Sequence, residues 1–206
     1  MVFSGIIDET AIVKRVTKKK DLYHLEIMVS WDFLEGLKLG TSVSVDGVCL
    51  TVSKVNKNVL SFDLVRETLN RTTLEEIIAN DSINIERSIK YGDEIGGHIV
   101  SGHISDKALV CRIERPTNNY IMTFQVNLDT MRYIFPKGFV ALNGISLTVG
   151  ETIPSQNTFT THIIPETLRK TNLSKKEVGS YLNLDFDSQT MSVVDTLLNL
   201  DEAKNG

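Results

Sequence analysis

The stretch VSVDGVCLTV, residues 43–52, recurs 97 residues further along the chain as VALNGISLTV, residues 140–149. In both stretches apolar residues occupy alternate positions on either side of a central Asp-Gly or Asn-Gly pair. A period of two predicts half-buried β-strands, and Asp-Gly and Asn-Gly tolerate the positive φ of a tight hairpin turn. Each stretch therefore predicts a β-hairpin, and its recurrence suggests that a whole structural unit is repeated.

Three further blocks recur in the same order. They are SGII at 4–7 with SGHI at 101–104, ETL at 67–69 with ETL at 166–168, and INIE at 83–86 with LNLD at 182–185. The first pair keeps the offset of 97 residues and the other two lie 99 residues apart, so the second copy has gained two residues near residues 154–157. Blocks in one order at nearly constant spacing indicate a tandem duplication.

Each copy has the pattern of a small all-β unit. Apolar and polar residues alternate over residues 23–29 and 122–126, and short apolar patterns with helical spacing occur at residues 32–37 and 129–135. About six short strands and one helical turn per copy predict a small closed barrel, which hides its strand edges. The predicted domains are an N-terminal barrel, residues 1–97, a C-terminal barrel, residues 98–187, and a C-terminal helix with its tail, residues 188–206.

The C-terminal segment has an apolar stripe with helical spacing. Its members are Val193, Val194, Leu197, Leu198 and Leu200. No third copy remains for this stripe to contact, so the helix either covers the end of a barrel or meets its equivalents in an oligomer. We favour the oligomer.

The composition excludes several classes of protein. No apolar run approaches the roughly 20 residues that a membrane-spanning helix needs, and Asp8 and Glu9 stand where a secretory signal would be basic or apolar. The formal net charge of −4 gives no general attraction to nucleic acid. We therefore expect a cytoplasmic protein without membrane or nucleic-acid partners, in which Cys49 and Cys111 stay reduced.

Positions at which the two copies differ are candidates for chemistry, because matched positions maintain the shared fold. The mismatched pairs are Ile6 with His103, Asp46 with Asn143, and Cys49 with Ser146. A lone cysteine is most often a small buried side chain, but a hydroxyl at the matching position points to a hydrogen-bonding or nucleophilic role. His103 is either an ordinary strand histidine or a general acid–base catalyst, since the usual histidine pKa of about 6.5 lies near neutral pH.

Other interpretations of the polar residues are less well supported. His98 and His103 are five residues apart, so an unbroken strand would point them to opposite faces, and no cluster of further ligands suggests a metal site. The glycines at 92, 96, 97 and 102 lack the Gly-Lys-Ser/Thr ending of a phosphate-binding loop. The Glu-Thr pair at 67–68 recurs at 166–167 and favours a task shared by both copies, such as binding the same ligand twice.

Taken together, the motifs resemble those of the riboflavin synthases of the homotrimeric α-chain type, a family with lumazine-binding repeats. The blocks that carry the resemblance are FSGI at 3–6, DGVCLTV at 46–52, ER at 86–87, IGGHIVSGH at 95–103, KGF at 137–139, NGISLTV at 143–149 and IPET at 164–167. The resemblance covers the chain from residue 3 to about residue 195, and the set of motifs is very specific.

The resemblance implies two six-stranded Greek-key β-barrels per chain and a C-terminal α-helix that holds a homotrimer. It implies a transferase that converts two molecules of 6,7-dimethyl-8-ribityllumazine to riboflavin and 5-amino-6-ribitylaminouracil by moving a four-carbon unit, with no cofactor or metal. The N-terminal barrel of one subunit would face the C-terminal barrel of a neighbour. Association with a lumazine synthase shell is left open.

Carried over residue by residue, the resemblance predicts one substrate pocket in each barrel. The N-terminal pocket would use Gly5, Ile6, Ile7, Ser42, Cys49, Leu50, Thr51, Asp63, Leu64, Val65, Arg66, Glu67 and Thr68. The C-terminal pocket would use Gly102, His103, Ile104, Lys137, Ser146, Leu147, Thr148, Ile163, Ile164, Pro165, Glu166 and Thr167. His103 and Ser146 would assist proton transfers, and Cys49 would orient or activate the acceptor. Asp185 or Asp187 would add a carboxylate to the C-terminal pocket.

One exchange departs from the family pattern. The family often has Asn before the first-barrel glycine and Asp before the second, whereas this chain has Asp46 and Asn143. If the second position supplies a base, the amide of Asn143 cannot replace it. If that position only shapes the turn, the exchange is harmless, and we favour this interpretation.

A rival function belongs to the lumazine proteins, which share the fold and serve as monomeric fluorescent antennae without catalysis. Their second copy tends to lose the Ser-Gly-His pattern, which this chain keeps at residues 101–103. Cys49 is kept as well, and the C-terminal segment suits trimer formation. The sequence therefore favours the enzyme.

Overall fold

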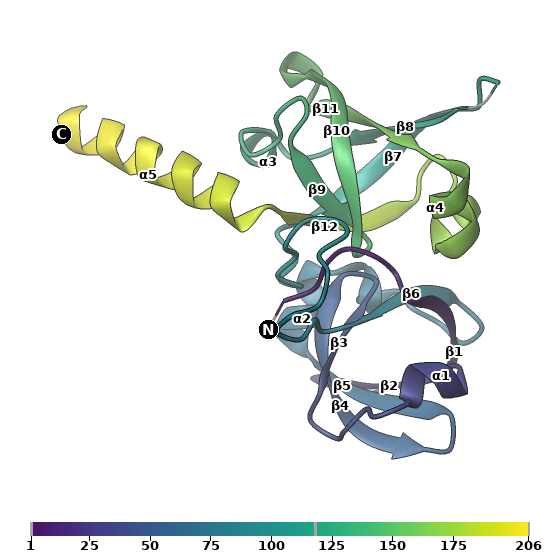
Figure 1. Ribbon diagram of the computed structural model, residues 1–206. Coiled ribbons are helices and arrows are strands. Elements are labelled where there is room, and N and C mark those ends of the chain that lie inside the picture. The colour runs from purple at the N-terminus through teal and green to yellow at the C-terminus, as the bar shows by residue number, and fades with distance from the viewer. Residues whose placement is uncertain (1, 118, 206) are drawn as a thin grey trace.

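The computed structural model describes residues 2–117 and 119–205, which form two closed β-barrels and one long helix (Figure 1). The strands of the first barrel are β1 (Glu9–Lys18), β2 (Leu22–Met28), β3 (Ser42–Val45), β4 (Val48–Asn56), β5 (Val59–Val65) and β6 (Ser82–Arg87). Those of the second are β7 (Asp106–Glu114), β8 (Tyr120–Gln125), β9 (Phe139–Leu142), β10 (Ile145–Ile153), β11 (Thr158–Ile163) and β12 (Tyr181–Phe186). The predicted all-β fold with two six-stranded barrels is confirmed.

Both barrels have the same order of strands. The first runs β1-β2-β5-β4-β3-β6, and the second, followed around its ring from its first strand, runs β7-β8-β11-β10-β9-β12. Each ring closes because the first strand of the copy pairs antiparallel with its last strand. The predicted Greek-key connection therefore occurs twice, as the duplication requires.

Short helices connect the strands. They are α1 (Trp31–Leu34), α2 (Arg66–Arg71), η1 (Thr73–Glu75), α3 (Leu128–Met131), η2 (Pro154–Gln156), α4 (Pro165–Lys170) and η3 (Asn172–Lys175). The helical patterns predicted at residues 32–37 and 129–135 correspond to α1 and α3, and both helices are shorter than predicted.

Each barrel has its own apolar core, formed by the inward side of alternating strand residues. On β4, Leu50 and Val52 are buried in the core, whereas Cys49 is half-buried and Thr51 is exposed. Successive side chains of a strand point to opposite faces, so Cys49 and Thr51 lie on the outer face of the barrel.

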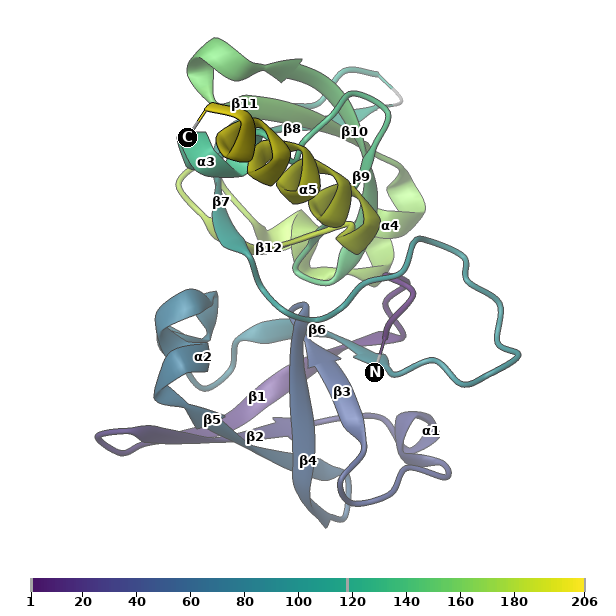
Figure 2. The ribbon, with the colours of Figure 1, turned by 90° about the vertical axis from the view of Figure 1, so that its left-hand side faces the viewer.

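The segment that precedes each barrel contacts the other barrel. Phe3 and Val100 form two mutual backbone hydrogen bonds of 2.8 and 3.0 Å, so the two leading segments run side by side. Figure 2 shows the purple N-terminal segment and the teal connection between the barrels. Ile7 is buried in the core of the second barrel, and Ile104 in the core of the first. The two copies are therefore interlocked.

Buried polar side chains join the barrels at their central turns. Asn84 Nδ2 donates to the carbonyl of Asn143 at 3.0 Å, and Asn183 Nδ2 donates to the carbonyl of Asp46 at 2.8 Å. The Asp46 carboxylate accepts the Asn84 N–H at 2.8 Å and an N–H of Asn172 at 2.9 Å, and the Asn143 amide oxygen accepts the Asn183 N–H at 2.8 Å. Asp46 and Asn143 thus have equivalent structural roles, which supports the interpretation that this position shapes the turn.

The helix α5 (Ser188–Asn205) extends away from the second barrel (Figure 1). Met191 packs against the core of that barrel, and Tyr133 Oη donates a hydrogen bond of 2.6 Å to Asp195. Four apolar residues of the predicted stripe are exposed, namely Val193, Leu197, Leu198 and Leu200, and Val194 is half-buried. In the described residues no helix has both the length and the apolar character to cross a bilayer.

Candidate active site

The mismatched residues Cys49 and Ser146 occupy equivalent places on the outer faces of the two barrels. Cys49 is the second residue of β4 and Ser146 is the second residue of β10. Both side chains are half-buried, and each is followed two positions later by an exposed threonine, Thr51 or Thr148. The duplication thus creates two similar surfaces with different reactive side chains.

Each of these two residues is contacted by the glycine segment of the other copy. The Ser146 N–H donates to the carbonyl of Gly5 at 2.9 Å, and the Cys49 N–H donates to the carbonyl of Gly102 at 2.9 Å. The two glycines have φ values of 74° and 77°, and a Cβ on either would lie 2.6 Å from the Cβ of the facing residue. Only glycine fits there.

These contacts correct the predicted grouping of the pockets. The prediction assigned residues 5–7 to the pocket of Cys49 and residues 102–104 to the pocket of Ser146. In the structure residues 5–7 lie beside Ser146 and residues 102–104 lie beside Cys49. The grouping carried over from the resemblance kept each segment with its own copy of the repeat.

A buried carboxylate holds each glycine segment. Glu86 accepts the N–H and O–H of Ser4 at 2.6 and 2.7 Å and the N–H of Gly5 at 3.1 Å. Asp185 accepts the N–H and O–H of Ser101 at 3.1 and 2.9 Å and the N–H of Gly102 at 2.9 Å. Burial raises the pKa of both carboxyls, that of Glu86 to about 7, although the hydrogen bonds oppose the shift.

The carboxylates of the two aspartates predicted for the C-terminal pocket are engaged by other hydrogen-bond donors. Asp185 stands on β12 of the second barrel and holds the segment that contacts Cys49. Asp187 accepts the N–H and O–H of Thr190 at 3.0 and 2.8 Å, and therefore stabilises the first turn of α5. Asp185 and Ser146 both pair with Ala141, so they flank it on the outer face of the second barrel, but the Asp185 carboxylate is engaged by the Ser-Gly segment.

His98, which was not among the predicted site residues, is the side chain in contact with Ser146. Its Nδ1 lies 2.7 Å from Ser146 Oγ, and its ring stacks on Phe139 with 5.5 Å between the ring centroids. Burial lowers the pKa of His98, and its Nε2 is buried without a hydrogen-bond partner among the described residues. The comparison of the repeats had no signal for it, because the position 97 residues earlier precedes the duplicated blocks.

His103 is exposed and lines a surface pocket of 530 Å³ together with Asp185 and Arg71. Its counterpart Ile6 lines a pocket of 460 Å³ with Glu86. The mismatch between Ile6 and His103 therefore places an imidazole in one of two related pockets and an aliphatic side chain in the other.

The remaining predicted residues divide by burial. Four of them point into the barrel cores and offer only backbone groups to a ligand, namely Leu50, Leu64, Leu147 and Ile163. Ser42 is also buried, but it pairs with Thr51 on the outer face, and its Oγ has no hydrogen-bond partner among the described residues. An unsatisfied buried hydroxyl is costly, so Ser42 Oγ is a candidate ligand contact.

The other predicted residues lie at the starts of α2 and α4. Val65 and Ile164 precede these helices and are exposed, so each presents an apolar side chain beside its barrel. The residues that follow are Arg66, Glu67 and Thr68 in α2, and Pro165, Glu166 and Thr167 in α4. Lys137 lines a separate surface pocket of 590 Å³ with His162. Within the described part of the chain no group of three His, Cys, Asp or Glu side chains could hold a metal ion.

Comparisons with known proteins agree with this doubled arrangement. A family model described as the lumazine binding domain matches residues 4–88 and again residues 101–187. A protein of Escherichia coli (strain K12) named riboflavin synthase is 43% identical over 197 residues, which cover 95% of this chain and 92% of that protein. The riboflavin synthase of Chlamydia muridarum is 36% identical over 205 residues, which cover 100% of this chain and 100% of that protein.

Solved structures show the same fold. LumP in complex with 6,7-dimethyl-8-(1'-D-ribityl) lumazine has a TM-score of 0.81 and 25% identity, covering 90% of this chain and 99% of that chain. LumP in complex with riboflavin has a TM-score of 0.83 and 26% identity, covering 90% of this chain and 100% of that chain.

Proposed function

This chain belongs to the riboflavin synthase family, and we propose that it catalyses the dismutation of two molecules of 6,7-dimethyl-8-ribityllumazine. One molecule gives a four-carbon unit to the other, and the products are riboflavin and 5-amino-6-ribitylaminouracil. The observation that carries the proposal is the doubled site. Cys49 and Ser146 lie at equivalent places, each against the Ser-Gly segment of the other copy.

A duplicated fold suits a reaction between two identical molecules. Each barrel holds one lumazine on its outer face, and two pseudo-symmetric sites can present the molecules to each other in opposed orientations. Orienting two reactants in this way replaces a bimolecular encounter and can correspond to an effective concentration of ~10⁵ M or more.

We assign the removal of a proton from the 7-methyl group of one lumazine to Ser146 and His98. When Nε2 of the neutral ring carries the proton, Nδ1 can accept the Ser146 hydroxyl proton across the 2.7 Å contact. Ser146 Oγ then takes the proton of the methyl group while its own proton passes to His98. The lowered pKa of His98 keeps the ring neutral and ready to accept.

Cys49 and His103 serve the other lumazine. Cys49 is half-buried against Gly102, and the next residue of that segment is the exposed His103. In this assignment Cys49 orients or activates the lumazine and His103 transfers protons to or from it. His103 and Ser146 both assist proton transfers, but they act in different sites.

The complete site forms between subunits. The exposed apolar residues of α5 need a partner surface, and three copies of the helix can bury them together. We therefore expect a homotrimer in the cytoplasm, in which the outer face of one barrel meets the opposite barrel of a neighbour. Light scattering of the purified protein measures the number of subunits.

Incubation of the purified protein with 6,7-dimethyl-8-ribityllumazine alone tests the function. We expect riboflavin to appear in the absorbance spectrum, one molecule for every two lumazines consumed. Ser146→Ala and Cys49→Ala should slow the reaction. Cys111→Ser is the matched control, since Cys111 is exposed on β7, contacts the Thr123 carbonyl and is not one of the predicted site residues. Tight binding without riboflavin would instead support the antenna function, which the structural likeness to LumP makes the second candidate.

A further inference from the structure

A row of outward-facing polar residues crosses four strands of the first barrel. Ser42 of β3 pairs with Thr51 of β4, and Asp63 of β5 pairs with His24 of β2. The register of β4 and β5 sets Thr51 and Asp63 at neighbouring positions. The row thus begins at the buried Ser42, whose Oγ has no partner among the described residues, and ends at an exposed histidine–aspartate pair.

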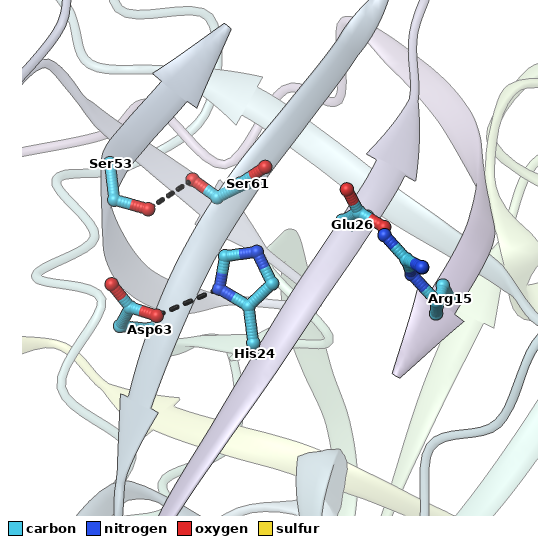
Figure 3. Close-up of polar contacts among 6 residues, drawn as sticks. All are labelled: Arg15, His24, Glu26, Ser53, Ser61 and Asp63. Atoms are coloured by element: carbon cyan, nitrogen blue, oxygen red, sulfur yellow. Dashed lines mark hydrogen bonds and ion pairs between the residues drawn. The ribbon is translucent and has the colours of Figure 1, made fainter. Parts of the chain in front are cut away.

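Figure 3 shows that the side chains of His24 and Asp63 face each other on the paired strands β2 and β5. Nδ1 of His24 lies 2.8 Å from Oδ1 of Asp63. Because a carboxylate only accepts hydrogen bonds, Nδ1 carries the proton and donates it. The second carboxylate oxygen of Asp63 then keeps its lone pairs for another donor. A separate pair lies nearby, Arg15 with Glu26 at 2.6 Å.

The second barrel has different chemistry at the same positions. His162 stands 99 residues after Asp63, and it pairs with Ile121 where Asp63 pairs with His24. Asn119 Nδ2 lies 2.9 Å from His162 Nδ1. The oxygen of the same amide accepts the Tyr120 N–H at 2.8 Å, which sets the amide orientation. Nδ1 of His162 is therefore the acceptor, and Nε2 of the neutral ring presents a donor.

We propose that His24 is a positioning residue that holds Asp63 ready to accept a hydrogen bond from a hydroxyl of the ligand polyol chain in the N-terminal site. At the corresponding position of the C-terminal site, His162 is held by Asn119, and its Nε2–H donates a hydrogen bond to the polyol chain instead. The two barrels thus bind the polyol chains of two identical molecules with opposite hydrogen-bond polarity. This inference rests on the proposed function, since it takes the outer faces around Cys49 and Ser146 as the substrate sites.

The unequal polarity has a consequence for the reaction. Two identical sites would bind two identical molecules in the same pose, and neither molecule would be selected as donor of the four-carbon unit. A polyol hydroxyl both donates and accepts, so each site retains affinity while the direction of the contact differs. His24 is separated from Cys49 along the outer face, so its effect falls on binding and pose and not on the proton transfers themselves.

The experiment is a titration of the protein with riboflavin, followed by quenching of flavin fluorescence and fitted to two classes of site per chain. His24→Ala should weaken one class about two- to fivefold, the range typical of exposed polar pairs. It should also raise the KM for the lumazine without changing kcat. His24→Gln keeps an N–H donor and should restore much of the affinity. Asn119→Ala should weaken the other class.

Glu26→Gln is the matched control, because it breaks the neighbouring ion pair on the same strand and should leave both classes unchanged. The inference is overturned if His24→Ala leaves both classes as in the wild type. It is also overturned if both classes weaken equally together with a lower Tm, because the pair would then only stabilise the barrel. Failure of the wild type to form riboflavin, with two classes of site still resolved, would refute the proposed function and not this inference.

Discussion

Replacing Asp46 by Asn should stabilise the protein at neutral and alkaline pH and should have little effect at acid pH. Asp46 is buried in the turn between β3 and β4, at the contact between the barrels. Burial raises its pKa from 3.8 to about 6, although the Asn84 and Asn172 hydrogen bonds and the charge of Lys176 favour the ionised form. Asp81 adds a smaller effect in the same direction as burial.

The direction of the pH dependence of stability follows from how tightly the folded and unfolded chains bind the Asp46 proton. Between pH 3.8 and about 6 the folded protein holds the Asp46 proton more tightly than the unfolded chain does, so the free energy of unfolding falls as the pH rises through this range. Above this range the ionised carboxylate costs about 3 kcal/mol relative to acid pH. Asn carries no charge and keeps an oxygen for the Asn84 N–H, as Asn143 does for Asn183.

Urea unfolding of the wild type and Asp46→Asn at a series of pH values from 4 to 8 measures this difference. The variant should gain up to about 3 kcal/mol at pH 8, or roughly 2–4 °C in Tm for each kcal/mol in a chain of this size, and nearly nothing at pH 4. Asn143→Asp is the matched control and should lose stability at pH 8 and recover it in acid. Parallel curves for wild type and Asp46→Asn across the whole pH range would refute the reasoning.

Three other predictions concern the site and the assembly. Ser146→Ala and His98→Gln should each lower the rate of riboflavin formation about 10²- to 10⁴-fold, the usual range for general acid–base catalysis. Titration with riboflavin should show nearly unchanged binding, and a large loss of affinity would contradict the assigned proton transfer. Protonation of Glu86 near its pKa of about 7 removes a hydrogen-bond acceptor from the Ser4–Gly5 segment. The KM of the wild type should therefore rise below pH 7, and Glu86→Gln should abolish that rise in steady-state assays. Leu197→Asp with Leu198→Asp should reduce the oligomer to monomers in light scattering and abolish turnover with the barrels still folded by circular dichroism; an active monomer would show that one chain contains a complete site.

The fold was predictable from the sequence because its signals are local. The alternation around residues 43–52 and 140–149 sets which side chains enter a core, and the Asp-Gly and Asn-Gly pairs set the hairpin turns. The nearly constant offset between the copies, 97 and then 99 residues, extended the prediction from one hairpin to two whole barrels. The candidate residues Cys49, His103 and Ser146 followed from comparison of the copies, because a duplication supplies its own reference sequence.

The sequence by itself thus determined two repeated barrels, their cores and the mismatched residues on them, whereas only the tertiary structure decided which residues meet. Gly5 lies beside Ser146, and Gly102 beside Cys49, through backbone hydrogen bonds between different copies. The offset of 97 residues is the same whether the leading segments stay with their own barrel or exchange, so spacing carries no information on this choice. The contact of His98 with Ser146 likewise joins a connecting segment to a strand 48 positions away. Such contacts depend on packing between distant segments, which no local periodicity encodes.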